Sequence, residues 1–261
     1  MANYREPYRS NLMCSPSANS PELSSATYTM RAILLGSTGL VGSLALKILN
    51  ECKEIDSIFT VSRRAPKVEG NKIDSVIEKD SDVWGDIIRK QKDNDLFISA
   101  FGTTKKLAGG NEGFLKIDYG VNYDAAKAAK DAGVKTFVLV SSGAASSLSP
   151  FFYLKTKGKL EDDVVALKFP RTIIIRPGVL LGERETSHGF FESSLVKVAL
   201  LVKNSVFAFP LYPAYDEEVA KAAIFTALEP LKSTEPEVVI VQGTEVNKTA
   251  KQYDAKYSNS T

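Results

Sequence analysis

Histidine and cysteine are scarce in this sequence. It contains one histidine, His188, and two cysteines, Cys14 and Cys52. A histidine-rich metal site is therefore excluded, and a Ser-His-Asp triad would have to use His188. Two cysteines indicate neither a disulfide framework nor a cysteine-rich metal site, and their low number fits a reducing compartment. We therefore expect no metal centre.

The sequence also lacks a strong excess of charge and a long apolar segment. Its formal net charge is +2 and its basic residues are scattered, so no nucleic-acid partner is expected. The most apolar window, Leu195 to Leu211, contains Lys197 and Lys203 and breaks at Pro210, which excludes a transmembrane helix. The apolar positions of this window either pack in the core or lie on a membrane face.

The first 29 residues differ in composition from the rest of the chain. Residues 1–29 contain six serines and three prolines, with no apolar run long enough for a signal peptide or a membrane anchor. Serine and arginine favour a mitochondrial targeting sequence, whereas two glutamates and the prolines favour a plain disordered tail. We expect a disordered segment and leave both interpretations open.

A glycine-rich turn organises the remaining sequence. Gly36, Gly39 and Gly42 have G-x-x-G-x-x-G spacing, between an apolar run that ends at Leu35 and an amphipathic segment. A strand, a tight glycine turn and a helix start in this order are typical of dinucleotide-binding folds. Glycine allows the backbone to approach a pyrophosphate, which binds to free N–H groups at the helix start. The turn therefore predicts a nucleotide site.

Strand-like and helix-like segments alternate beyond this turn. The alternation predicts an α/β fold, with a Rossmann-like doubly wound parallel sheet in a domain of residues 30–245. Residues of about 182–215 are expected to form a small substrate cap, and residues 246–261 a polar, frayed tail. The expected strands cover residues 33–35, 57–62, 73–77, 96–101, 136–140, 172–175 and 238–241, and the expected longer helices cover residues 41–49, 118–132, 151–168, 190–203 and 216–228.

The end of the second expected strand bears on the choice of nucleotide. An acidic residue at this position binds the 2′-hydroxyl of NAD, whereas arginine accommodates the 2′-phosphate of NADP. The sequence has Arg63 and Arg64 there and no acid. Because the guanidinium fork matches a phosphate, NADP(H) is preferred over NAD(H). The alternative interpretation is two solvated cations after an edge strand.

Two residues four positions apart are the candidates for proton transfer. Tyr153 and Lys157 share one face of an expected helix that starts where the carboxyl ends of the strands meet. A neighbouring ammonium stabilises phenolate, so this tyrosine can exchange a proton with a carbonyl or alcohol oxygen. Tyr123 and Lys127 have the same spacing, but Lys127 is expected to face solvent, so we interpret that pair as a chance match. Gly102 and Thr103 should border the cofactor.

Several of these motifs together resemble a known family. The glycine turn GSTGLVG, Arg63-Arg64, Ser141-Ser142, Tyr153 with Lys157 and the RPG at 176–178 resemble the atypical branch of the short-chain dehydrogenase/reductase superfamily. The segments FGTTKKLAGGNEGFLKIDYGVN, FFYLKTKGKLEDDV and RPGVLLGERE are similar to the animal Tat-interacting oxidoreductase and its fungal relatives, peripheral proteins of the mitochondrial outer membrane. The resemblance extends from Met30 to about Val241.

The resemblance implies a role for individual residues. It implies Tyr153 as the proton acceptor, Lys157 on the nicotinamide ribose and Ser142 as the substrate-orienting hydroxyl. Ser142 precedes Tyr153 by 11 positions, a shorter gap than in most single-domain members, so Ser141 is an equal candidate. His188 stands where the animal relative has a cofactor-proximal arginine, or is a surface loop residue. The implied NADPH contacts are Thr38, Gly39, Leu40 and Val41 beside Gly36 and Gly42, then Arg63, Arg64, Phe101, Gly102 and the main chain near Leu180.

Three functional hypotheses follow from the sequence. The first is an NADPH-dependent oxidoreductase that reduces a small carbonyl substrate, with a proton from Tyr153. The second is an NADPH-sensing adaptor at the mitochondrial surface, which binds a protein partner or a membrane without significant turnover. The third, a nucleotide-sugar epimerase, would need tightly retained NAD, which Arg63 and Arg64 disfavour.

Overall fold

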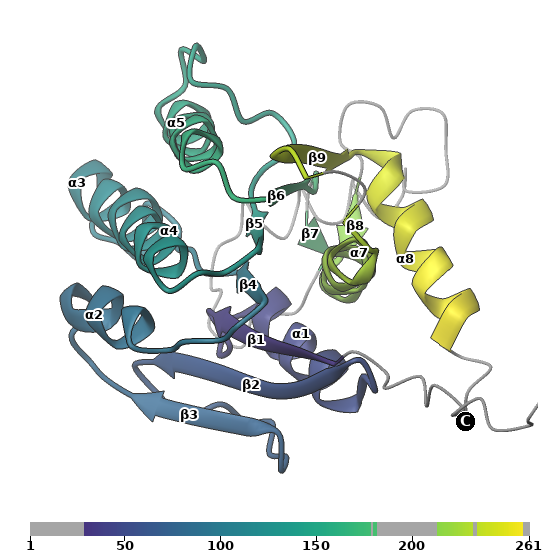
Figure 1. Cartoon of the computed structure of the whole chain (residues 1–261). Helices are drawn as coiled ribbons and strands as arrows, with labels where there is room; N and C mark the ends of the chain where they lie inside the picture. Colours follow the sequence, from purple (N-terminus) through teal and green to yellow (C-terminus); the bar gives the residue numbers. More distant parts are fainter. Residues whose placement is uncertain (1–28, 179, 182–212, 232–233, 258–261) are drawn as a thin grey trace, which may run out of the picture.

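The computed structural model describes residues 29–178, 180–181, 213–231 and 234–257, and these form a seven-stranded parallel sheet with helices on both faces (Figure 1). The strand order is β3-β2-β1-β4-β5-β6-β9, which confirms the doubly wound, Rossmann-like prediction. The strands of this sheet are β1 (Met30–Leu35), β2 (Ile55–Ser62), β3 (Ile73–Ile77), β4 (Leu96–Ser99), β5 (Thr136–Val140), β6 (Arg171–Arg176) and β9 (Glu237–Gln242). Two further strands, β7 (Leu180–Leu181) and β8 (Ala214–Tyr215), pair with each other in parallel.

The inner strands are largely buried because helices cover both sides of the sheet. In β1 the four residues from Ala32 to Leu35 are fully buried, and all of β4 is buried too. Continuous burial of this kind is typical of parallel sheets. The edge strands differ: Ile77 on β3 is 57% exposed, and β9 leaves Val238 and Ile240 exposed.

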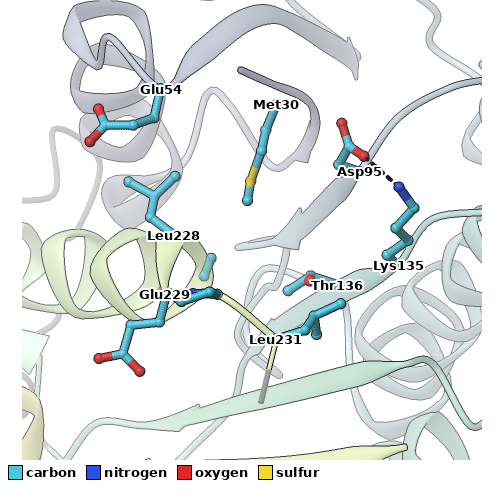
Figure 2. Close-up of a pocket in the computed structure, with 10 residues that line it drawn as sticks. Met30, Glu54, Asp95, Lys135, Thr136, Leu228, Glu229 and Leu231 are labelled. Carbon is cyan, nitrogen blue, oxygen red and sulfur yellow. Dashed lines mark hydrogen bonds and ion pairs between the residues drawn. The ribbon is translucent and has the colours of Figure 1, made fainter. Parts of the chain in front are cut away.

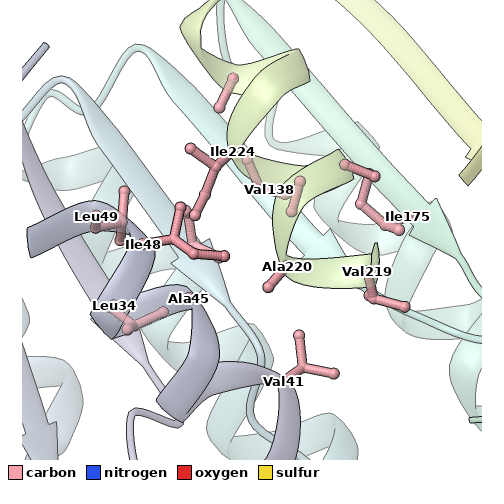
Figure 3. Close-up of a cluster of buried hydrophobic side chains, with 14 of the residues drawn as sticks. Leu34, Val41, Ala45, Ile48, Leu49, Val138, Ile175, Val219, Ala220 and Ile224 are labelled. Atoms are coloured by element: carbon pink, nitrogen blue, oxygen red, sulfur yellow. The ribbon is translucent and has the colours of Figure 1, made fainter. Parts of the chain in front are cut away.

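The helices divide between the two faces. Helices α1 and α7 pack together on one face, and α2, α4 and α5 cover the other. Figure 3 shows the first layer, where the small side chains of Ala45 and Ala220 allow α1 and α7 to approach over Val138 and Ile175 of the sheet. The helices are α1 (Leu40–Glu51), α2 (Trp84–Arg89), α3 (Asn111–Phe114), α4 (Asn122–Asp131), α5 (Phe152–Ala166), α7 (Asp216–Leu228) and α8 (Thr244–Tyr257), with a 3₁₀ turn η1 (Ser81–Val83) and a π-helix η2 (Leu115–Val121).

The chain after β9 is a helix, and our prediction of a frayed tail there was wrong. Helix α8 packs on α7 and buries Val246, Thr249 and Ala250, which recur at the spacing of one helical face. The hydroxyl of Tyr257 donates a hydrogen bond of 2.9 Å to Glu54. Lys221 and Asp254 form an ion pair of 2.6 Å between the two helices. A narrow apolar stripe therefore fixes a segment that is polar on average.

The expected helix of residues 118–132 is two segments of different geometry. The π-helix η2 starts three residues earlier, at Leu115, and leads into α4 at Asn122. Gly133 ends this region with a φ of +89°, as predicted for a glycine after a helix. π-Helical turns are frequent at functional sites, so η2 is a candidate part of such a site.

Part of the expected substrate cap lies outside the described residues. Residues 182–212, which include His188, the helix expected at 190–203 and the apolar window 195–211, are not described by the structure. The end of the expected cap region forms β8, which pairs Ala214 with Leu180 and Tyr215 with Leu181. The backbone N–H of Tyr215 donates a 2.7 Å hydrogen bond to Glu218, which fixes the start of α7.

Candidate functional site

The glycine turn lies where the strand order reverses. From β1 the chain runs outward through β2 to β3, then returns to place β4 on the other side of β1. Ligands of such sheets bind at this switch point, beyond the carboxyl ends of the strands. Gly36 follows β1 with a φ of +92°, and a Cβ atom there would lie 2.7 Å from the backbone of Ala100 and Phe101 after β4. Only glycine fits at this position.

The start of α1 presents uncapped backbone N–H groups. Its N-cap, Gly39, has no side-chain cap, and the first helical bond is donated by Ser43 to the Gly39 carbonyl at 2.9 Å. The N–H groups of Leu40, Val41 and Gly42 precede that bond and so have no partner within the helix. The Val41 side chain is buried, so this residue offers a ligand its backbone only. The geometry is that of an anion site.

The two arginines lie at the same rim of the sheet as the glycine turn. β2 is the parallel neighbour of β1, and Arg63 and Arg64 directly follow its last residue, Ser62. Both arginines are exposed, and the Ser62 hydroxyl donates a 2.6 Å hydrogen bond to the Arg64 carbonyl, which fixes the strand tip. Their guanidinium groups are thus available to a phosphate at the rim.

Tyr153 and Lys157 lie one turn apart on α5 in different environments. The Lys157 side chain is only 7% exposed and its Nζ lies 2.9 Å from Oδ1 of Asp118. Burial acts to lower the pKa of Lys157, but attraction to Asp118 and to Tyr153 outweighs burial and raises this pKa. Tyr153 is 36% exposed, and its ring packs against Phe114 at 5.4 Å between centroids. The lysine is therefore a fixed buried cation beside an accessible phenol.

The second tyrosine and lysine pair differs because its lysine is not buried. Lys127 is 45% exposed and forms a 2.8 Å ion pair with Asp124 on its own helix. Tyr123 stacks on Tyr119, with ring centroids 5.7 Å apart. The prediction that Lys127 faces solvent is confirmed, and this pair is an ordinary helix surface.

The two serines after β5 are buried to different degrees. Ser141 is buried, its backbone N–H continues the sheet by donating to Ile175, and its hydroxyl has no partner among the described residues. Ser142 is half-buried, and its carbonyl accepts a 3.0 Å hydrogen bond from Ala145 in the following turn. The role of Ser142 in orienting a substrate stays a prediction, with Ser141 as its alternative.

Sequence reasoning missed two polar residues at the centre of the site. Asp118 and Asn122 are each 1% exposed. Asn122 donates hydrogen bonds to the carbonyls of Asp118, at 2.8 Å, and of Phe101, at 3.2 Å, and accepts one from Ser99 on β4. The two residues are four apart and share the face of Val121 and Ala125, which are buried. Polar side chains on an otherwise apolar stripe were the signal that could have identified them.

A second buried ion pair extends the polar cluster along α5. Glu161, one turn after Lys157, is 2% exposed and accepts hydrogen bonds of 3.1 Å and 2.5 Å from the guanidinium of Arg176 at the end of β6. This bond fixes α5 against the strand that leads into the RPG segment. The pKa of Arg176 is raised because Glu161 stabilises its charge.

A cavity of about 490 Å³ lies away from this site. Figure 2 shows residues that line it, among them Met30, Asp95, Lys135 and Thr136. Met30 and Thr136 begin β1 and β5, so the cavity lies at the amino ends of the strands, whereas the glycine turn lies at their carboxyl ends. None of the predicted site residues lines it. Over the described ranges there is also no cluster of three or more potential metal ligands.

Within the ranges that the structure covers, no helix has both the length and the apolarity that a membrane span requires.

Comparison with known proteins identifies close relatives in fungi. A sequence model of the HIM1 family matches residues 52–208. Protein FMP52, mitochondrial, of Meyerozyma guilliermondii is 95% identical over 232 residues, which are 89% of this chain and 100% of the relative. The proteins of the same name in Debaryomyces hansenii and Candida albicans are 51% and 44% identical, over 82% and 85% of this chain and 95% and 98% of theirs.

Solved structures share the fold at low sequence identity. A UDP-glucose 4-epimerase of Thermotoga maritima has a TM-score of 0.60 at 15% identity, covering 89% of this chain and 84% of its own. The oxidoreductase ylbE of Lactococcus lactis has a TM-score of 0.58 at 21% identity, covering 85% and 96%. MoeE5, solved in complex with UDP-glucose and NAD, has a TM-score of 0.59 at 13% identity, covering 87% and 82%. These likenesses agree with the sheet order described above.

Proposed function

The chain belongs to the HIM1 family, and we propose that it is an NADP(H)-dependent oxidoreductase that reduces a small carbonyl compound. One observation carries the proposal. Lys157 is buried four residues after Tyr153, at the rim that also holds the glycine turn, and its Nζ would be 3.8 Å from a Cβ placed on Gly102. A fixed cation beside an accessible phenol at a nucleotide-binding rim is an arrangement for proton transfer.

The residues of the rim fit a dinucleotide. Gly36 and Gly42 allow the start of α1 to lie close to the chain after β1 and β4, and the uncapped N–H groups of Leu40 and Val41 are suited to a pyrophosphate. Phe101, Gly102 and the main chain near Leu180 would border the nicotinamide half, with Thr38 and Gly39 at the turn itself. When bound, the nicotinamide would supply the hydride.

The proton for the reduction would come from the protein's own residues. In this proposal Tyr153 donates its hydroxyl proton to the carbonyl oxygen of the substrate as that oxygen gains charge. Lys157 holds the nicotinamide ribose and stabilises the phenolate that remains on Tyr153. Ser142 or Ser141 donates a hydrogen bond that orients the substrate oxygen.

We predict that replacing the two rim arginines with acids lowers the affinity for NADPH much more than the affinity for NADH. In the double variant Arg63→Glu, Arg64→Glu, NADPH binding is expected to weaken by at least about tenfold, because each lost charge-assisted hydrogen bond to phosphate contributes about 1.5 to 3 kcal/mol. NADH binding is expected to change little. Fluorescence titration of both coenzymes measures the two dissociation constants.

The control for this titration changes the net charge equally at a distance from the rim. Lys47→Glu, Lys53→Glu alters two exposed lysines, on α1 and in the turn after it. If the control weakens NADPH binding as strongly as the arginine variant, a general charge effect explains the result and the phosphate assignment is wrong.

The proposal also includes the cellular location of the protein. The relatives in three yeasts are named mitochondrial, and on this basis we propose a mitochondrial location for this chain. The finer proposal is peripheral attachment to the outer membrane. It is supported by Leu107 and Phe151, each 68% exposed, next to the exposed Lys105 and Lys106. Lys105 lies 5.1 Å from the ring of Phe152, so this loop and the start of α5 are neighbours.

The exposed surface around Leu107 and Phe151 also favours the adaptor as a second candidate function, and binding to lipid vesicles tests this possibility. We expect the double variant Leu107→Asp, Phe151→Asp to lose at least half of the binding to vesicles with anionic lipids, because it removes apolar area and adds negative charge. Flotation measures the bound fraction. Ile77→Asp, Val238→Asp changes two exposed apolar residues on edge strands and is expected to bind normally. Binding that rises with NADPH, in a protein that turns over no carbonyl, would favour the adaptor over the enzyme.

A further inference from the structure

Asp118 is a buried carboxylate held on an irregular helix. It lies within η2, the seven-residue π-helix Leu115–Val121, and is 1% exposed. Its carbonyl accepts the 2.8 Å hydrogen bond from Asn122, whose side chain also bonds to Phe101 and Ser99 at the end of β4. These bonds attach the π-helix to the carboxyl end of β4. The position of Asp118 is therefore fixed relative to the sheet rim.

Both carboxylate oxygens of Asp118 face the proposed site. Oδ2 accepts a 2.7 Å hydrogen bond from the backbone N–H of Thr103. Oδ1 lies 2.9 Å from Nζ of Lys157. One side chain thus connects the turn after β4 to the lysine on α5.

The glycine of this turn leaves room for the carboxylate. A Cβ atom on Gly102 would lie 3.2 Å from Oδ1 of Asp118 and 3.8 Å from Nζ of Lys157. The first distance is shorter than ordinary van der Waals contact, so a side chain at Gly102 would require the carboxylate or the turn to shift by a few tenths of an ångström. Glycine at position 102 therefore provides the space that the ion pair between Asp118 and Lys157 occupies.

Within the described part of the chain, two titratable groups besides Asp118 act on the Lys157 ammonium. Tyr153 and Glu161 face it from one turn before and one turn after on α5. Glu161 is bonded to Arg176, with its closest contact at 2.5 Å. Asp118, from η2, is therefore the carboxylate that balances the lysine charge, since burial alone acts to lower the pKa of Lys157.

We propose that Asp118 is a positioning residue for Lys157, which holds the lysine ammonium charged and directed at the nicotinamide ribose and Tyr153. The inference rests on the proposed oxidoreductase function for its effect on turnover. The effect of Asp118 on the protonation of Lys157 does not depend on a substrate and can be measured without one.

Removing only the charge of Asp118 tests the proposal. Asp118→Asn leaves a buried ammonium without a counter-charge, so the pKa of Lys157 falls and the lysine loses its proton at lower pH. We expect kcat for carbonyl reduction to fall by about 100-fold, as is typical of a misplaced catalytic group. We also expect the loss of activity on the alkaline side to begin at lower pH than in the native protein.

A double-mutant cycle separates positioning from a general loss of structure. If Asp118 acts through Lys157, then Asp118→Asn lowers kcat strongly in the native background and not in the Lys157→Met background. The double variant lacks both charges of the Asp118–Lys157 pair, so it is expected to be at least as stable as Lys157→Met alone, even if Asp118→Asn does not fold. Equal losses of kcat in both backgrounds, or a double variant that is less stable than Lys157→Met, would overturn the proposal.

A measurement without substrate distinguishes failure of this inference from failure of the proposed function. The ¹⁵N-labelled lysine ζ-amine resonance, assigned with Lys157→Met, is followed against pH in native protein, Asp118→Asn and the control Asp163→Asn. The control removes the carboxylate that pairs with Lys159 at 2.6 Å on the same helix. A lower pKa of Lys157 in Asp118→Asn alone supports the inference, whether or not NADPH binds. An unchanged pKa overturns it, and a native protein that binds no NADPH overturns only the proposed function.

Discussion

Replacing Tyr153 by phenylalanine is expected to lower carbonyl reduction by about a thousandfold, because general acid catalysis contributes about 10² to 10⁴. The variant lacks the hydroxyl alone. The ring of Tyr153 packs against Phe114 and is partly exposed, so its phenylalanine counterpart keeps the same packing. NADPH binding and thermal stability are expected to stay close to native values. Steady-state oxidation of NADPH, over a panel of small carbonyl compounds, measures the effect.

The chain supplies its own control for this experiment. Tyr123→Phe makes the same chemical change in a pair with the same spacing, on a helix surface where Lys127 pairs with Asp124. It is expected to leave turnover unchanged. If Tyr153→Phe matches the native rate on every carbonyl compound that the protein reduces, Tyr153 is not the proton donor.

The second large effect is expected at the glycine turn. A Cβ atom on Gly42 would lie 2.0 Å from the carbonyl oxygen of Gly36, which is far inside van der Waals contact. The obstacle is backbone, so Gly42→Ala forces α1 away from the end of β1. We expect a destabilisation at or above the usual overpacking cost of about 1 to 3 kcal/mol, with NADPH binding reduced beyond detection. Urea denaturation and coenzyme titration measure the two effects.

A glycine on an ordinary helix provides the comparison. At Gly85 on α2 the nearest atom to a new Cβ would be the Asp124 carbonyl oxygen at 3.7 Å, which is normal contact. Gly85→Ala is expected to be neutral or to stabilise the protein by up to about 1 kcal/mol, since alanine favours helix. A Gly42→Ala protein with native stability and native NADPH affinity would contradict the close approach of helix and strand.

The sequence predicted the sheet well because the strands are short runs rich in apolar or β-branched residues between turn residues. Residues 73–77 and 136–140 are strands with the predicted bounds, and α7 has the predicted bounds as well. The same periodicity could not show the π-helix, because the wider turn at Asp118 is accompanied by hydrogen bonds that join Asn122 to Ser99 on β4, 23 positions earlier, and to Phe101 after it. Tertiary contacts determined the local geometry there.

The candidate site was predicted in part. Spacing placed Tyr153 and Lys157 on one helical face and the glycines at the turn. It could not reveal that Lys157 is buried against Asp118, because that pair joins residues 39 positions apart. The tail after β9 was mispredicted for a related reason: three buried residues on α8 are enough to dock a helix whose remaining surface is polar. Pairings across the fold are not encoded in any one segment.

The position of β1 in the sheet has a consequence for synthesis on the ribosome. β1 pairs with β2 soon after both emerge, but its other neighbour, β4, begins at Leu96. Until then the fully buried residues of β1 have one unsatisfied edge, which is the kind of edge that recruits other chains. At about 5 to 20 residues per second this interval lasts several seconds. The nascent amino-terminal half is therefore expected to expose a strand edge that a chaperone could cover.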